Sequence, residues 1–129
     1  MDISVRYYSR SGNTKAIAEA IADACGVKAV SVDSAEAVFS KADVLFIGGA
    51  LYAYGLDENL NEYLDTLKKE DVKKAVIFSS TWISKHSIEL IRKKLQKKGI
   101  EVAEESFYVR GKPSVKQLNE AKAFAERMA

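Results

Sequence analysis

Short apolar segments alternate with amphipathic helical segments along this 129-residue chain, and this alternation constrains the fold more than any other feature. The predicted strands, in chain order, are 3–8, 27–32, 43–48, 75–78 and 101–109. Segment 43–48 (DVLFIG) is apolar after its first residue, as is typical of a strand covered on both faces. Between the strands, apolar residues recur at spacings of three and four, which predicts helices.

The ends of the predicted helices are marked by capping residues. After the first strand, a helix begins at Asn13, carries Ile17 and Ile21 on one face, and ends before Gly26. The other predicted starts, in chain order, are Asp33 or Ser34 for a short helix through Phe39, then Asp57, Ser87 and Ser114. A helix therefore follows each predicted strand.

This order of elements predicts an α/β fold made of parallel β-α-β units with right-handed crossovers. The chain is too short for an eight-fold barrel, so we expect a doubly wound five-stranded parallel sheet of order 2-1-3-4-5. No linker-like or repeated segment divides the sequence, and we expect residues 1–129 to form one domain. In such a sheet the ligand site lies at the carboxyl ends of the strands.

Composition narrows the function classes. Lys and Arg number 20 and Asp and Glu 18, and this net charge of +2 gives no argument for nucleic-acid binding. One cysteine and one histidine cannot build an internal disulfide or a zinc site of four such ligands. No apolar run reaches the roughly 18–20 residues of a membrane span, and no secretory signal pattern is visible. We therefore expect a cytoplasmic protein without a membrane span.

The loop after the first strand has the composition of a phosphate-binding loop. Its residues are Ser9, Arg10, Ser11, Gly12, Asn13 and Thr14. Hydroxyls and a carboxamide surround a glycine there, and N–H groups at the start of the next helix point into the same space. The loop lacks the Gly-Lys-Ser/Thr end of a P-loop and the glycines of a Rossmann loop. Ordinary capping by Ser11, Asn13 or Thr14 is the alternative interpretation.

The same region carries the spacing of a known family signature. The matching residues are Val5, Tyr7, Ser9, Gly12, Thr14, Ala18 and Ile21. The chain resembles a short-chain flavodoxin, and the likeness in element order covers its whole length. The resemblance implies a flavodoxin-like fold and an FMN cofactor whose phosphate is held by neutral donors of this loop. Arg6 departs from the pattern, because an apolar or aromatic residue is expected there.

Two further loops at the same end of the predicted sheet are candidates for holding the flavin ring. The loop 49–55 contributes Ala50, Leu51, Tyr52, Ala53, Tyr54 and Gly55, and the loop 79–86 contributes Ser80, Thr81 and Trp82. The resemblance implies that Trp82 forms one wall of the ring site and Leu51, Tyr52 or Tyr54 the other. Alternatively, Trp82 covers the top of the core and Tyr52 packs on a helix. The loop 79–86 contains no glycine, although flavodoxins are often glycine-rich there.

The resemblance favours an FMN-binding protein that relays electrons between redox partner proteins, a reductase donor and a one-electron acceptor. A second hypothesis is an FMN-dependent reductase of quinones or similar small acceptors, with His86 or Tyr54 near the ring. A third is a flavodoxin-fold interaction module without a cofactor. Flavodoxins tend to present an acidic surface to basic partners, and the candidates for it here are Asp57, Glu58, Glu62 and Asp65. The lysine-rich run 92–98 is either a solvated helix face or a contact for an acidic partner.

Overall fold

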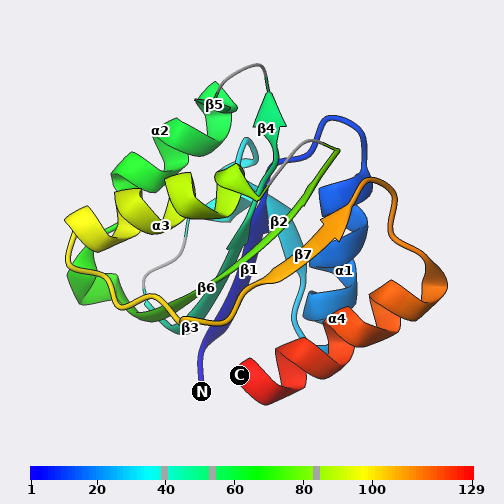
Figure 1. Cartoon of the computed structure of the whole chain (residues 1–129). Coiled ribbons are helices and arrows are strands. Elements are labelled where there is room, and N and C mark those ends of the chain that lie inside the picture. The colour runs from blue at the N-terminus through cyan, green and yellow to red at the C-terminus, as the bar shows by residue number, and fades with distance from the viewer. Residues whose placement is uncertain (39–40, 53–54, 83–84) are drawn as a thin grey trace.

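The central sheet is parallel throughout and follows the strand order that the sequence predicts (Figure 1). The computed structural model describes residues 1–38, 41–52, 55–82 and 85–129. The strands of this sheet are β1 (Ile3–Tyr7), β2 (Ala29–Ser31), β3 (Ala42–Gly48), β6 (Val72–Thr81) and β7 (Phe107–Arg110). They pair in the order β2-β1-β3-β6-β7, so their carboxyl ends share one edge.

Helices cover both faces of the sheet (Figure 1). One face carries α1 (Asn13–Cys25) and α4 (Val115–Met128), and the other carries α2 (Glu58–Thr66) and α3 (His86–Lys97). Two 3-10 helices, η1 (Ala35–Ala37) and η2 (Lys69–Asp71), precede β3 and β6. A small antiparallel hairpin of β4 (Leu51–Tyr52) and β5 (Gly55–Leu56) follows β3.

The core is divided by the sheet because successive strand residues point to opposite faces. On the first face, Val5, Phe46 and Phe78 pack with α1 and α4 in one buried cluster. On the second face, Leu45 and Ile77 pack with α2 and α3 in another. The apolar segment predicted as a doubly covered strand is β3, which is buried from Val44 to Gly48. The prediction of a doubly wound sheet is therefore confirmed.

Several predicted helix ends are confirmed by cap geometry. Gly26 ends α1 in the left-handed conformation with a φ of 68°. Asp57 caps α2 by accepting the backbone N–H of Asn59, and Ser114 forms a capping box with Gln117 at the start of α4. The short helix expected through Phe39 is instead the 3-10 helix η1, capped by Ser34, and Phe39 lies outside the described residues.

Several predicted boundaries are wrong by one or more residues; the strand predicted at 27–32, for example, is β2, Ala29–Ser31. The strand predicted at 75–78 is longer, because β6 runs from Val72 through Thr81. Helix α3 begins at His86 rather than Ser87. The strand predicted at 101–109 is interrupted: Val102 pairs with Ala75, and regular pairing resumes only where Phe107 meets Phe78. The polar segment 104–106 lies between these two pairings and leaves the ladder.

Arg6, the departure from the family pattern, is buried on the second face of the sheet with 7% of its surface exposed. Its Nε donates to the carbonyl of Ala37 at 2.9 Å, and a terminal nitrogen donates to the carbonyl of Val5 at 3.0 Å. The Tyr63 hydroxyl donates to the same Ala37 carbonyl at 2.7 Å. Arg6 therefore anchors η1 to the sheet and to α2, which explains how a charged side chain is accommodated there.

Candidate functional site

The loop after β1 turns directly into α1 at the carboxyl edge of the sheet. Gly12 is the N-cap of α1, has a φ of 91°, and supplies no side-chain cap to the helix. A Cβ added at Gly12 would meet nothing within 4 Å, so the space in front of the helix end is open. The serine hydroxyls shape the loop: Ser9 Oγ accepts the Gly12 N–H at 3.0 Å, and Ser11 Oγ accepts the Asn13 N–H at 3.3 Å.

Some helix-end donors of α1 have no acceptor among the described residues. The amides of Thr14 and Lys15 make no hydrogen bond to another residue in that part of the chain. Thr14 itself is 1% exposed, which places its short side chain beneath the loop rather than in solvent. The helix dipole and these free N–H groups make this end of α1 suited to an anion. Side-chain capping, the alternative interpretation, is present only in part: Ser11 Oγ accepts the Asn13 N–H, whereas the N-cap residue Gly12 has no side chain with which to cap the helix.

An ion pair joins this loop to the second one. The Arg10 Nε donates to Asp57 Oδ2 at 3.0 Å, and a terminal guanidinium nitrogen donates to the same oxygen. Asp57 is 4% exposed and also accepts the backbone and side-chain N–H groups of Asn59. Burial alone would raise the pKa of Asp57, but the hydrogen bonds from Asn59 and Arg10 and the positive charge of Arg10 outweigh it and lower the pKa. The Arg10 charge is therefore paired within the protein.

The second loop follows β3 and contains the β4–β5 hairpin. Leu51 is half-buried, and Ala50, Tyr52 and Gly55 lie in or beside the hairpin. Ala53 and Tyr54, both predicted at the site, lie outside the described residues. Figure 1 shows the hairpin projecting beyond the carboxyl edge of the sheet, beside the loop that leads into α1.

The third segment differs most from its predicted form, because Ser80 and Thr81 belong to β6. Ser79 Oγ donates to the Gly49 carbonyl at 2.5 Å and lies 2.6 Å from Ser87 Oγ. Ser80 Oγ donates to the Gly111 carbonyl at 2.5 Å and is 3% exposed. These hydroxyls therefore tie β6 to neighbouring loops, and the Ser80 hydroxyl is already engaged within the protein.

Trp82, directly after β6, is 66% exposed and does not plug the core. Its indole lies against Gly111, so closely that a Cβ added to Gly111 would collide with the ring. Gly111 has a φ of 73° and donates its N–H to the Thr81 carbonyl at 3.2 Å. Sequence reasoning missed Gly111. The available signal was a lone glycine just past the last strand, a position where a backbone can approach a neighbour closely.

Three other kinds of site were considered: the thiol of Cys25, the hollow between η1 and α2, and a metal site. Cys25 ends α1 at the other end of the sheet, and burial, with a smaller contribution from Glu126, raises the pKa of its thiol. A hollow of about 240 Å³ lies between η1 and α2, lined by Ala37, Tyr63 and Leu67 among others. It includes none of the residues predicted to hold a cofactor. Within the described ranges, no group of three or more His, Cys, Asp or Glu residues is placed to hold a metal ion.

Comparison with known proteins identifies the family to which this chain belongs. The family model described as "Flavodoxin domain" matches residues 4–128, so the chain belongs to the flavodoxin domain family. Among solved structures, a flavodoxin from the domain Archaea is similar with a TM-score of 0.87 and 26% sequence identity, covering 100% of this chain and 96% of that one. No curated protein sequence matches the chain.

More distant structures share the fold. Oxidised flavodoxin 1 from Bacillus cereus is similar with a TM-score of 0.79 and 18% identity, over 98% of this chain and 95% of that chain. Rubredoxin oxygen:oxidoreductase from Desulfovibrio gigas is similar with a TM-score of 0.80 and 16% identity, over 96% of this chain and 34% of that chain. The second comparison shows that the fold also occurs as part of a larger protein.

Proposed function

We propose that this chain binds FMN at the carboxyl edge of its sheet and relays electrons between redox partner proteins. The observation that carries the proposal is the arrangement of that edge. The open N-terminus of α1 at Gly12 and the exposed indole of Trp82 belong to the same edge, in a chain of the flavodoxin family. One loop offers donors for a phosphate and the other offers a flat apolar surface for a ring.

The donor set of the first loop fits the phosphate of FMN. The Thr14 and Lys15 amides would donate to it, and the Ser9, Ser11 and Asn13 side chains would complete the loop with neutral groups. Arg10 is paired with Asp57, so its part is to hold the loop in position rather than to supply a free charge. Lys15, exposed in the first turn of α1, adds a positive charge beside the loop.

The apolar residues of the other two segments fit the isoalloxazine. Trp82 has a large exposed surface, and a flat ring placed against it would remove that surface from water. The half-buried Leu51 would contact the other side of the ring from the hairpin, with Tyr52 and Tyr54 as the further candidates. Bound FMN would supply one- and two-electron redox chemistry, while the protein orients the ring and excludes water from part of it.

The proposal has three further components. We propose that residues 1–129 act as one flavodoxin-like domain, because one sheet carries both clusters of the core. We also propose a cytoplasmic location. Among the helices of the described ranges, none has the length and apolar character needed to cross a membrane. Redox partner proteins, rather than small quinone-like acceptors, are the proposed donors and acceptors.

The test is the visible absorption spectrum of the purified protein, followed by release and identification of the chromophore. We expect flavin bands and release of FMN, with the emission of the bound flavin strongly quenched by Trp82. The Trp82→Ala variant should recover part of that emission, whereas the Val38→Ala variant, at an exposed residue that lines the hollow between η1 and α2, should not. A colourless protein that stays colourless after incubation with FMN would favour an interaction module without a cofactor. Turnover of a quinone with reduced nicotinamide by the isolated protein would favour a reductase.

A further inference from the structure

We infer that the edge around the candidate flavin site docks an acidic redox protein, which is the reverse of the acidic surface that the sequence resemblance implies. The inference rests on the proposed function, since it concerns the acceptor that would receive electrons there. The observations behind it are which charged side chains at this edge are paired within the protein and which are exposed without an ion pair.

Two of the four carboxylates expected to form an acidic surface are paired with basic side chains of the same chain. Asp57 is 4% exposed, caps α2 and is paired with Arg10. Asp65 lies at the far end of α2 and is paired with Lys94 at 3.0 Å. Asp65 stays exposed, but of the predicted set only Glu58 and Glu62 are exposed and take part in no ion pair among the described residues; both lie on α2. The acidic surface is therefore reduced to one side of the edge.

Positive side chains gather on the other side, around Trp82. We call Lys85, Arg110 and Lys112 the basic rim; all three are exposed. The Lys85 ammonium lies 5.4 Å from the centre of the Tyr108 ring, which directs it towards β7. Arg110 is paired in register with Thr81, one residue before Trp82. Lys112 follows Gly111, on which the indole of Trp82 lies.

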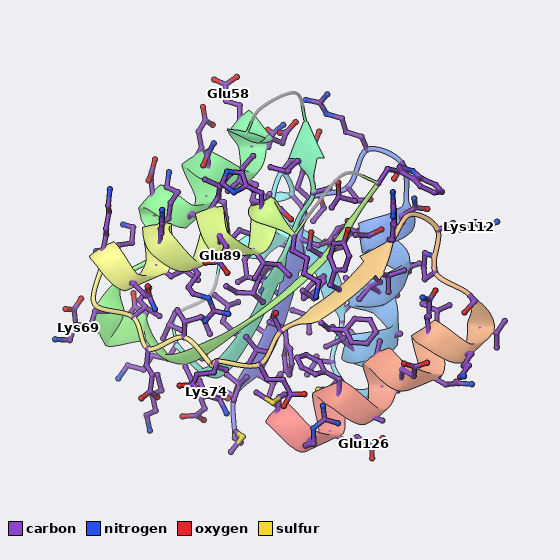
Figure 2. All side chains as sticks on the ribbon, viewed as in Figure 1. Glu58, Lys69, Lys74, Glu89, Lys112 and Glu126 are labelled. Carbon is purple, nitrogen blue, oxygen red and sulfur yellow. The ribbon has the colours of Figure 1, made fainter. Side chains whose placement is uncertain are left out.

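The basic rim has no carboxylate partner among the residues that the structure describes. In the part of the chain that the structure describes, none of its three side chains takes part in an ion pair. Figure 2 shows Lys112 extending outwards from the loop between β7 and α4, whereas Glu58 and Glu89 lie over α2 and α3. An unpaired positive rim beside an exposed aromatic ring is the arrangement of a protein interface, with an apolar centre and a charged border.

The positive charge of the basic rim indicates which kind of partner surface it would bind. Three unpaired cations favour a surface rich in Asp and Glu and repel a basic one, and the attraction is felt over about 8–10 Å at physiological salt. The acceptor is therefore an acidic protein with a one-electron centre near its surface. In the transfer itself, one electron would pass from the reduced cofactor to the partner's metal centre, as when Cu(II) becomes Cu(I), and no atom would be exchanged.

The chain offers a matched control for the rim. Lys69, Lys93 and Lys97 are also exposed and unpaired in the described residues, but Lys69 lies in η2 and the other two on the second half of α3. In Figure 2, Lys69 lies at the opposite side of the molecule from Lys112. The triple variants Lys85→Glu/Arg110→Glu/Lys112→Glu and Lys69→Glu/Lys93→Glu/Lys97→Glu therefore change the net charge equally at two different places.

The experiment measures binding of fluorescently labelled acidic plastocyanin by anisotropy, with a basic c-type cytochrome as the opposite probe. We expect plastocyanin to bind more tightly than the cytochrome, and the affinity to fall steeply between about 20 and 200 mM salt. The rim variant should lose roughly tenfold or more in affinity for plastocyanin, whereas the control variant should change by about twofold or less. Reduction of plastocyanin by the reduced holoprotein should slow in the same order.

Equal losses in the two triple variants would overturn the inference, because net charge alone would then explain binding. Tighter binding of the cytochrome would overturn it as well. Binding does not require the cofactor, so the two proposals fail separately. A protein that binds FMN but does not use the rim contradicts only the docking inference. A protein that uses the rim but never binds FMN contradicts only the proposed function.

Discussion

Arg10 and Asp57 form an ion pair that links the loop after β1 to the start of α2. The same carboxylate caps α2 through the Asn59 N–H at 2.8 Å. One side chain thus fixes both the first loop of the candidate site and the helix that follows the second loop. The acidic residue that the family resemblance placed on a docking surface is instead part of the internal framework of the site.

The Asp57→Asn variant should separate these two roles. Asparagine caps helices about as well as aspartate, but it removes the charge that holds Arg10. We expect the free energy of unfolding to fall by about 1.5–3 kcal/mol, the usual value of a hydrogen bond to a charged group. Urea unfolding at neutral pH measures it. Asp65→Asn is the control, because its pair with Lys94 is exposed and should contribute less than about 1 kcal/mol. Equal effects of the two substitutions would contradict the structural role of Asp57.

The contribution of Asp57 should depend on pH in a defined direction. Its pKa in the folded protein is below the ordinary value of 3.8, so the unfolded chain binds the proton more readily. The stabilisation is therefore fully present above pH 3.8 and is lost as the pH falls through the lower folded pKa. We expect the difference in unfolding free energy between the native chain and Asp57→Asn to be constant from pH 7 to 5 and to shrink below about pH 4. A difference that grows on acidification would contradict this assignment.

Much of the fold could be predicted from the sequence because its signals are local. The glycine that ends α1 and the Asp57 and Ser114 caps each act within a few residues, and the structure confirms them. The end of β6 could not be found in this way. The residues Ser79–Thr81 have the composition of a polar loop. The Ser79 and Ser80 hydroxyls are nevertheless buried, because Gly49, Ser87 and Gly111 supply their partners from other segments.

The same difference between local signals and contacts that depend on the fold applies to the candidate site. The phosphate loop was recognisable because its glycine, serines and helix start are contiguous. The contact between Trp82 and Gly111 was not, because it depends on how β6 and β7 are paired and on which way the indole turns. The pairing of Arg10 with Asp57 likewise required the three-dimensional order of β1 and β3.

Gly111→Ala tests whether the contact with Gly111 sets the position of Trp82. The added Cβ would occupy the place of the indole, so the ring must move, and the positive φ adds backbone strain of about 1 kcal/mol. We expect a change in the emission and iodide quenching of the only tryptophan, together with weaker FMN binding. Gly26→Ala is the matched control, because its φ of 68° carries similar strain while its Cβ would meet nothing within 4 Å. Unchanged emission in Gly111→Ala would show that this contact does not position the indole.

The central claim, that the first loop holds the phosphate of FMN, is tested most directly by titrating the flavin-free protein with FMN and with riboflavin. The two ligands differ only in the phosphate, and loss of flavin fluorescence reports binding of either. We expect FMN to bind roughly a hundredfold more tightly or better, because the phosphate would receive several N–H donors at the end of α1. Ser11→Asp should remove most of that preference and Ser11→Asn, its uncharged counterpart, should keep it, since Ser11 is exposed and both variants are expected to fold. Equal affinity for FMN and riboflavin in the native chain would contradict the account.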